Sequence, residues 1–119
     1  MKLIAQIDEE CCPQILQAPL DEDQADALSA ALKVLADPAR LRLVSLIAAQ
    51  PEAEACVCNL TEPLGLSQPT VSHHLRVLHE AGVLDRERRG QWVYFKLRPE
   101  PLDLVSAALS SVKAKRRSA

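Results

Sequence analysis

The sequence contains very few glycine and aromatic residues. Its 119 residues include three glycines and one each of tryptophan, tyrosine and phenylalanine. So few glycines leave no glycine-rich loop of the kind that cradles anions in many enzymes. The apolar residues are mostly leucine, alanine and valine, a composition typical of a helical protein. At this length we expect one small domain, or one protomer of a dimer.

The sequence also lacks an apolar run long enough to span a membrane. Its first ten residues, MKLIAQIDEE, do not contain the apolar segment of a secretory signal peptide. We therefore expect a cytoplasmic protein. In a reducing cytosol the four cysteines are expected to be thiols rather than structural disulfides. They are Cys11, Cys12, Cys56 and Cys58, and their spacing is not the C-x-x-C of zinc ribbons or thioredoxin-like sites.

The charge is small overall but unevenly distributed. A net charge of −2 argues by itself against nucleic acid binding. Residues 1–37, however, contain two lysines and eight acidic residues, a net charge of −6, whereas residues 67–98 carry a net charge of +3. The tail from Lys113 adds four positive charges. An acidic end and a basic half suit a protein that touches DNA with one surface only.

Two helices are predicted in the first half of the chain. Residues 1–20 are interpreted as an arm outside the main core. Asp21–Ala36 has apolar residues at helical spacing and acidic residues in its first turn. Asp37 is a candidate N-cap for a second helix, Pro38–Ala49, because proline is well tolerated at the first helical position. Residues 50–54 are predicted to form a loop.

The pattern from Ser67 to Gly82 predicts a helix with two chemically different faces. Ser67 is a candidate N-cap, and Gly82 stands where a helix can end in a left-handed residue. One face is fit for a core and consists of Val71, His74, Leu75 and Leu78. The other side offers side chains that can bond base edges and phosphates: Gln68, Thr70, Ser72, His73 and Arg76. An ordinary amphipathic surface helix would show the same pattern, so the neighbouring segments decide.

These neighbours favour a DNA-binding motif. A short predicted helix, Cys58–Leu64, and a turn at Gly65 precede the Ser67 helix at helix-turn-helix spacing. Leu84–Leu97 then changes to a strand-like pattern around Gly90 and predicts a hairpin. A basic hairpin after a recognition helix is a wing, although a solvated hairpin tip is the alternative. The predicted phosphate or minor-groove contacts of this wing are Arg86, Arg88 and Arg89.

A last helix is predicted from Pro99 to about Val112, followed by a basic tail, 113–119. Together with Asp21–Ala36 it carries more apolar surface than a small core uses, so we expect these two helices to form a two-fold dimer interface. The predicted fold is mainly α with a small β-hairpin: a dimeric winged helix-turn-helix domain that spans residues 21–112.

With these elements placed, the chain resembles the ArsR/SmtB family of metal-sensing repressors. The stretches that carry the resemblance are ADPARLRLV (36–44), ACVCNL (55–60), LSQPTVSHHLRVL (66–78) and AGVLDRERRGQWVYF (81–95). The resemblance implies a regulator rather than an enzyme. It implies a homodimer that binds a palindromic operator in double-stranded DNA when metal-free and leaves it when metal binds.

The resemblance also bears on the metal ligands. The arsenic-sensing prototypes of the family look like C-V-C-x-x-C, but here Thr61 stands at the third cysteine position. A site of acidic and histidine ligands on the last helix is not matched, because residues 99–112 contain no histidine. Similarity to members with an N-terminal cysteine arm implies that this arm supplies the missing thiolates to the other protomer. The predicted ligands are Cys11, Cys12 and Cys56, with Cys58 as a fourth ligand or simply buried.

Thiolates select soft ions, so the predicted inducer is As(III) or Sb(III), with Cd(II) or Pb(II) as the alternative. Within a regular helix, C-x-C side chains point about 200° apart and cannot both face one ion. Either the helix begins at Cys58, leaving Cys56 free to turn, or only one of the two is a ligand. They can also be small apolar fillers. The helical spacing of His73 and His74 does not favour a shared metal, and we expect His74 to be packed and hydrogen-bonded.

Three other functions fit parts of the sequence. A repressor controlled by thiol oxidation would use the same cysteines. A thiol enzyme, such as an arsenate reductase, would need an anion-binding loop and a resolving cysteine. A metal-delivery protein would leave the recognition helix and the wing without a purpose.

Overall fold

The computed structural model describes residue 15 and residues 18–110, so Cys11, Cys12 and the predicted basic tail lie outside the described residues. The elements, in chain order, are α1 (Glu22–Leu35), α2 (Pro38–Ala48), the 3-10 turn η2 (Pro51–Ala53), β1 (Glu54–Cys56), the 3-10 turn η3 (Val57–Asn59), α3 (Thr61–Leu64), α4 (Gln68–Glu80), β2 (Leu84–Arg89), β3 (Trp92–Leu97) and α5 (Pro99–Leu109). None of the helices within this described part is long and apolar enough to cross a membrane.

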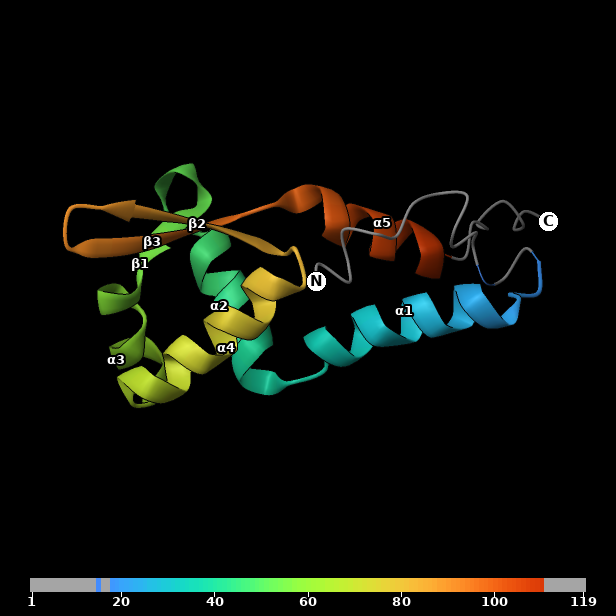
Figure 1. The fold of residues 1–119 in the computed structure, drawn as a ribbon, viewed down its shortest axis with the longest axis horizontal. Helices are drawn as coiled ribbons and strands as arrows, with labels where there is room; N and C mark the ends of the chain where they lie inside the picture. Colours follow the sequence, from blue (N-terminus) through green and yellow to red (C-terminus); the bar gives the residue numbers. More distant parts are fainter. Residues whose placement is uncertain (1–14, 16–17, 111–119) are drawn as a thin grey trace.

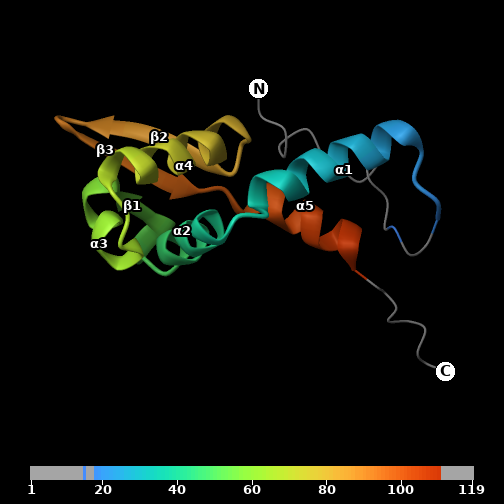
Figure 2. The ribbon, with the colours of Figure 1, turned by 90° about the horizontal axis from the view of Figure 1, so that it is seen from below.

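The molecule has two parts, which Figure 1 shows side by side. One is a lobe built from α2, α3, α4 and the three-stranded sheet, with the β2–β3 hairpin projecting from its end. The other is the pair α1 and α5, which runs away from the lobe on the opposite side (Figures 1 and 2). A single buried apolar cluster joins them, with members from both helices of the pair and from the lobe.

Side-chain caps fix the starts of three helices, and two of these caps, Asp37 and Ser67, were predicted from the sequence. The Asp21 carboxylate accepts a hydrogen bond from the backbone N–H of Gln24, and the Gln24 side chain accepts one from the backbone N–H of Asp21. The Asp37 carboxylate accepts two backbone N–H bonds in the first turn of α2, at 2.9 and 3.2 Å. The Ser67 hydroxyl accepts the N–H of Thr70 at the start of α4. These caps satisfy donors that have no partner within the helix.

The helix-turn-helix motif is formed by α3, a turn at Gly65 and α4. Gly65 has a φ of 68°, a left-handed conformation in which glycine carries no steric cost. Its backbone N–H bonds back to the last turn of α3. The core face predicted for α4 is confirmed, because Val71, Leu75 and Leu78 are fully buried. α4 ends at Glu80, and the chain leaves it through Gly82 with a φ of 92°.

The sheet has one more strand than the hairpin predicted from the sequence. Its antiparallel order is β1-β3-β2, and Gly90 closes the β2–β3 turn with a φ of 65°. The prediction of a plain loop over residues 50–54 was wrong at its end, because Glu54–Cys56 pairs with β3 as β1. The predicted helix from Cys58 to Leu64 is also divided into η3 and α3. A strand of three residues is too short to show an alternating pattern of its own.

Asp37→Asn is expected to make the protein less sensitive to acid. The backbone hydrogen bond from Arg40 holds the pKa of the Asp37 carboxyl below its ordinary value of 3.8. A lowered folded pKa stabilises the fold above the unfolded value, and this stabilisation is lost as the pH falls through the folded pKa. Asparagine keeps the cap without titrating. Urea unfolding of both proteins from pH 7 to pH 3 should show the wild type losing more stability below about pH 4. Parallel losses in both proteins would contradict this assignment.

Candidate nucleic-acid interface and cysteine site

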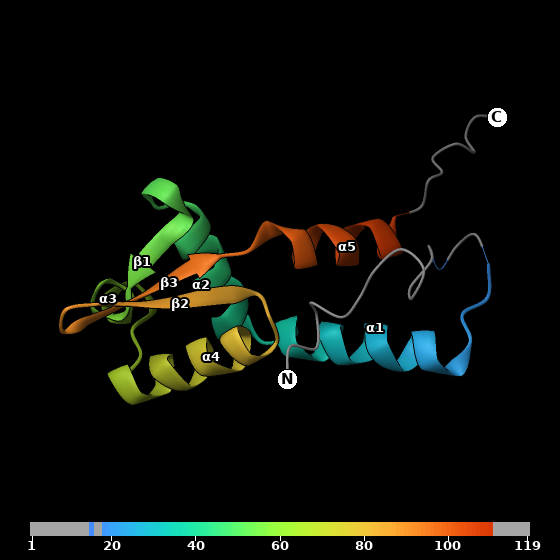
Figure 3. The ribbon, with the colours of Figure 1, turned by 45° about the horizontal axis from the view of Figure 1, so that its top comes forward.

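The side of α4 away from the core presents the polar residues that the sequence predicted as DNA contacts. Gln68, Thr70, His73 and Arg76 are exposed, and Ser72 is half-buried. Nη2 of Arg76 lies 3.5 Å from Nδ1 of His73, one turn earlier on the same side of the helix. Figure 3 shows that α4 runs along the sheet beside β2, so this polar face and the hairpin border the same side of the lobe. Amide, hydroxyl and guanidinium groups at these positions can bond base edges and phosphates.

A groove of about 600 Å³ separates α4 from the wing and from the turn after β1. Among the residues that line it are Gln68, Ser72 and Arg76 of α4, Arg86 of β2, and both cysteines of the C-V-C stretch. Trp92, the only tryptophan, also lines the groove and is about half exposed. The structure therefore brings some of the predicted DNA contacts, namely Gln68, Ser72, Arg76 and Arg86, together with Cys56 and Cys58, whereas Thr70, His73, Arg88 and Arg89 do not line this groove.

The three wing arginines do not share one face of the sheet. Arg86 pairs with Phe95 and Arg88 with Val93, whereas Arg89 pairs with Trp92. Because successive strand residues point to opposite faces, Arg89 lies on the face opposite Arg86 and Arg88. That Arg86, Arg88 and Arg89 contact phosphate or the minor groove stays a prediction, with Arg89 on the other face of the hairpin from the first two.

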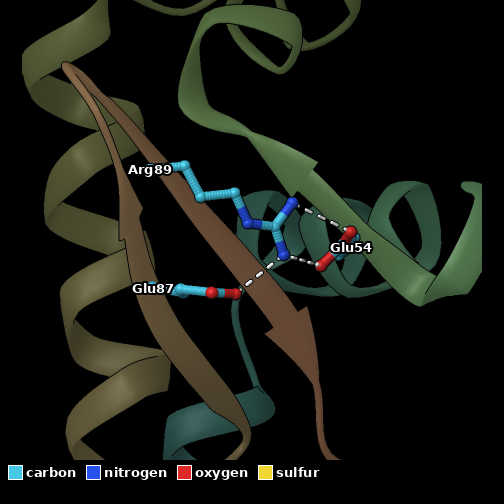
Figure 4. A network of polar contacts seen from close by, with 3 residues as sticks. All are labelled: Glu54, Glu87 and Arg89. Atoms are coloured by element: carbon cyan, nitrogen blue, oxygen red, sulfur yellow. Dashed lines mark hydrogen bonds and ion pairs between the residues drawn. The ribbon is translucent and has the colours of Figure 1, made fainter.

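The guanidinium of Arg89 is already bound within the protein (Figure 4). It donates to both carboxylate oxygens of Glu54, at 2.8 and 3.1 Å, and to Glu87 at 2.7 Å. The hydrogen bond to Arg89 holds the pKa of Glu54 below its usual range, and the bond to Glu54 raises the pKa of Arg89. Sequence reasoning missed this network, because Glu54 and Arg89 are 35 residues apart and belong to strands that are not adjacent.

Cys56 and Cys58 face each other in the structure. Cys56 is the last residue of β1 and the N-cap of η3, and its sulfur accepts the backbone N–H of Cys58 at 3.3 Å. Their Cα atoms are 5.2 Å apart, and their sulfurs are paired as a disulfide. The backbone stays extended through Cys56 and turns only at Val57, so the 200° separation of a regular helix does not apply.

Cys56 and Cys58 differ in exposure, and the described residues around them do not complete a set of three metal ligands. Cys56 is buried, with 3% of its surface exposed, whereas Cys58 is exposed. In the described range, 18–110 with residue 15, no three Cys, His, Asp or Glu residues are grouped so that they can hold an ion. The reduced pair offers two adjacent thiolates, a donor set that suits soft ions. Further ligands would have to come from outside this range, where Cys11 and Cys12 lie.

His74 is a packed residue of the core side, as predicted. Its Nδ1 accepts a hydrogen bond from Nε of Arg40 at 3.2 Å. The same guanidinium donates to the carbonyl oxygen of Val34 at 3.0 Å. Arg40 of α2 thereby connects the end of α1 to the recognition helix. The sequence did not identify Arg40 as a structural residue, because its partners Val34 and His74 belong to two other helices.

The pair α1 and α5 leaves an apolar groove of about 380 Å³. Leu28 and Leu32 of α1 and Leu109 of α5 line it, together with Ile15. Leu32, Leu109 and Ile15 are each more than one-third exposed. Large apolar side chains at the surface of such a groove are typical of an interface.

The tight turn, the polar recognition helix and the wing define a winged helix-turn-helix protein. The profile of the bacterial regulatory proteins of the arsR family matches residues 37–86. The arsenic resistance transcriptional regulator ArsR1 of Pseudomonas putida is 52% identical over 80 residues, which cover 67% of this chain and 61% of that protein. The arsenical resistance operon repressor of Staphylococcus xylosus is 35% identical over 85 residues, 71% of this chain and 79% of that protein.

Solved structures agree with these relatives. The crystal structure of a possible transcriptional regulator for arsenical resistance has a TM-score of 0.58 and 38% identity, covering 64% of this chain and 76% of that one. The chain belongs to the arsR family of bacterial regulatory proteins. It spans between 56 and 61% of the length of several curated relatives that it matches. The predicted family and the predicted fold class, mainly helical with a winged helix-turn-helix, are confirmed.

Proposed function

We propose that this protein is a transcriptional repressor that binds operator DNA through α4 and the wing, and leaves it when As(III) or Sb(III) binds its cysteines. The observation that carries the proposal is the shared groove, in which Cys56 and Cys58 lie beside Gln68, Ser72 and Arg76. An ion bound to these sulfurs would lie next to side chains that read DNA. The similarity to arsenic resistance regulators supports As(III) among soft inducers, ahead of Cd(II) and Pb(II).

The proposed inducer site uses the cysteine pair in its reduced form. Arsenite, As(OH)₃, would exchange its three hydroxyls for the sulfurs of three thiols, whose protons leave with the hydroxyls as three waters. Cys56 and Cys58 supply two neighbouring sulfurs, and Cys11 and Cys12 of the arm are proposed to supply the rest. Cys56 is the N-cap of η3, and its sulfur accepts the backbone N–H of Cys58, which holds it beside the second sulfur.

The proposed active species is a homodimer in the cytoplasm. Its interface would cover the apolar groove of α1 and α5, which leaves the two recognition helices free. A palindromic operator requires these helices to lie about 34 Å apart, one turn of DNA. Ligation beside α4 would favour a geometry that no longer fits two successive major grooves. A coupling free energy of about 1–3 kcal/mol would be enough to weaken operator binding by 5- to 150-fold.

Fluorescence anisotropy of operator DNA tests this function. The reduced full-length chain should bind DNA with nanomolar affinity and lose it on addition of arsenite or antimonite, with cadmium and lead as comparison ions. Cys11→Ser and Cys12→Ser should each weaken the response. Operator binding that arsenite leaves unchanged would contradict the proposed inducer, and a chain that does not prefer operator over random DNA would contradict the proposed repressor.

The paired sulfurs of Cys56 and Cys58 favour one second candidate, a repressor controlled by thiol oxidation. In that case an oxidant such as hydrogen peroxide would close the disulfide and release the DNA without any metal. The same anisotropy assay distinguishes the two functions, because peroxide and arsenite can be added separately to reduced protein.

A further inference from the structure

The side chain of Arg89 crosses the whole sheet (Figure 4). Arg89 is the last residue of β2, and the middle strand β3 separates β2 from β1. Its guanidinium lies over the ring of Tyr94 on β3, 4.3 Å from the ring centre. Beyond that ring it makes its two hydrogen bonds with Glu54 on β1. One side chain therefore connects all three strands.

The charges around Arg89 do not favour a contact with DNA. Two carboxylates, Glu54 and Glu87, bind the same guanidinium, so the charge of Arg89 is compensated within the protein. Lys96, which pairs with Glu54, adds a second positive charge, so these four side chains are neutral together. A guanidinium whose donors are shared by two carboxylates has little attraction left for phosphate.

The partner of Arg89 belongs to the strand that carries the cysteine site. Glu54 is two residues before Cys56, and both lie on β1. Cys56 pairs with Tyr94, which also supports the Arg89 guanidinium. A displacement of Cys56 would therefore move the carboxylate and the strand pair that hold Arg89, and Arg89 lies next to the turn of the wing.

We propose that Arg89 is a positioning residue that fastens the wing to the cysteine strand, and that it does not contact DNA. Arg89 would also transmit the effect of inducer binding at Cys56 to the wing, and this second role rests on the proposed function. A single exposed ion pair would be too weak for this role. Here a bidentate contact, a second carboxylate and an aromatic ring act on one guanidinium, which fixes its geometry.

Glu54→Gln tests this role, with Glu87→Gln as the matched control. Both variants remove one negative charge from the cluster, but only Glu54→Gln weakens the connection to β1. Operator affinity, measured by anisotropy over a range of salt concentrations, should fall roughly three- to tenfold in Glu54→Gln, with an unchanged salt dependence. Glu87→Gln should bind as tightly as the wild type or more tightly. Adding Arg89→Gln to Glu54→Gln should cause little further loss, because both act through one contact.

An increase in the operator affinity of Glu54→Gln would overturn the proposal. If Arg89 contacts phosphate, Glu54→Gln releases its guanidinium, so binding becomes tighter and its salt dependence steeper. Equal affinities of Glu54→Gln and Glu87→Gln would also overturn it. A thermal unfolding midpoint near that of the wild type verifies that Glu54→Gln is folded. These measurements use no inducer, so they decide the role of Arg89 even if arsenite has no effect on the wild type.

The inducer adds a readout that a merely structural role would not change. Glu54→Gln should bind arsenite with wild-type affinity, yet its operator affinity should fall by a smaller factor when arsenite is added. If arsenite lowers the operator affinity of Glu54→Gln by the same factor as that of the wild type, the coupling does not pass through this contact.

Discussion

Cys56→Ser is expected to abolish the response to arsenite while the protein remains bound to its operator. Serine has nearly the shape of cysteine but offers no soft sulfur, so the proposed ligand set loses its one buried sulfur within the groove. The release factor, expected between about 5- and 150-fold in the wild type, should fall to about one. Anisotropy titrations of operator DNA without and with arsenite give the two operator affinities whose ratio is the release factor.

Cys58→Ser is the matched variant, because it changes the exposed member of the pair instead of the buried one. It should reduce the arsenite response less than Cys56→Ser does. The reverse order, in which only Cys58→Ser loses the response, would overturn the choice of Cys56 as the main ligand. Because Cys56 is buried, thermal unfolding of Cys56→Ser is needed to show that the loss comes from the missing sulfur and not from unfolding.

Arg76→Gln is expected to weaken operator binding by roughly 5- to 150-fold, since a good guanidinium contact with a base or phosphate carries about 1–3 kcal/mol. Arg76 is exposed on α4 and lines the groove, so its removal leaves the core unchanged. The salt dependence distinguishes the two kinds of contact. A phosphate contact predicts a slope smaller by about one, and a base contact predicts relaxed specificity at one position.

Lys96→Gln is the control for Arg76→Gln, because it removes the same charge from an exposed position of β3 that does not line the groove. It should change operator affinity by much less. Equal losses in both variants would mean that operator binding responds to total charge rather than to a contact made by α4.

Much of the fold follows from local signals in the sequence. Asp21, Asp37 and Ser67 are caps whose partners lie within three residues, so the helix starts could be predicted from the adjoining sequence. The buried face of α4 follows from the spacing of Val71 and Leu75, because one helical period decides which residues share a side.

The parts that could not be predicted depend on distant partners. β1 forms because Glu54–Cys56 meets a strand about forty residues later, and three residues show no period by themselves. The hydrogen bonds between Arg89 and Glu54 could not be predicted, since the sequence does not show which carboxylate lies across the sheet. The contact between Cys56 and Cys58 could not be predicted either. It depends on where the chain turns from strand to 3-10 helix, and the sequence does not show that position.

The single tryptophan gives this molecule a built-in optical probe. Trp92 is the first residue of β3, about half exposed, and lines the groove together with both described cysteines. All indole fluorescence of the unlabelled chain therefore comes from the wing. The proposed ion binding at the sulfurs, oxidation of the pair and docking of DNA would all take place at this groove. Each of them can be followed by emission spectroscopy in real time, without attaching a dye that would itself disturb the surface under study.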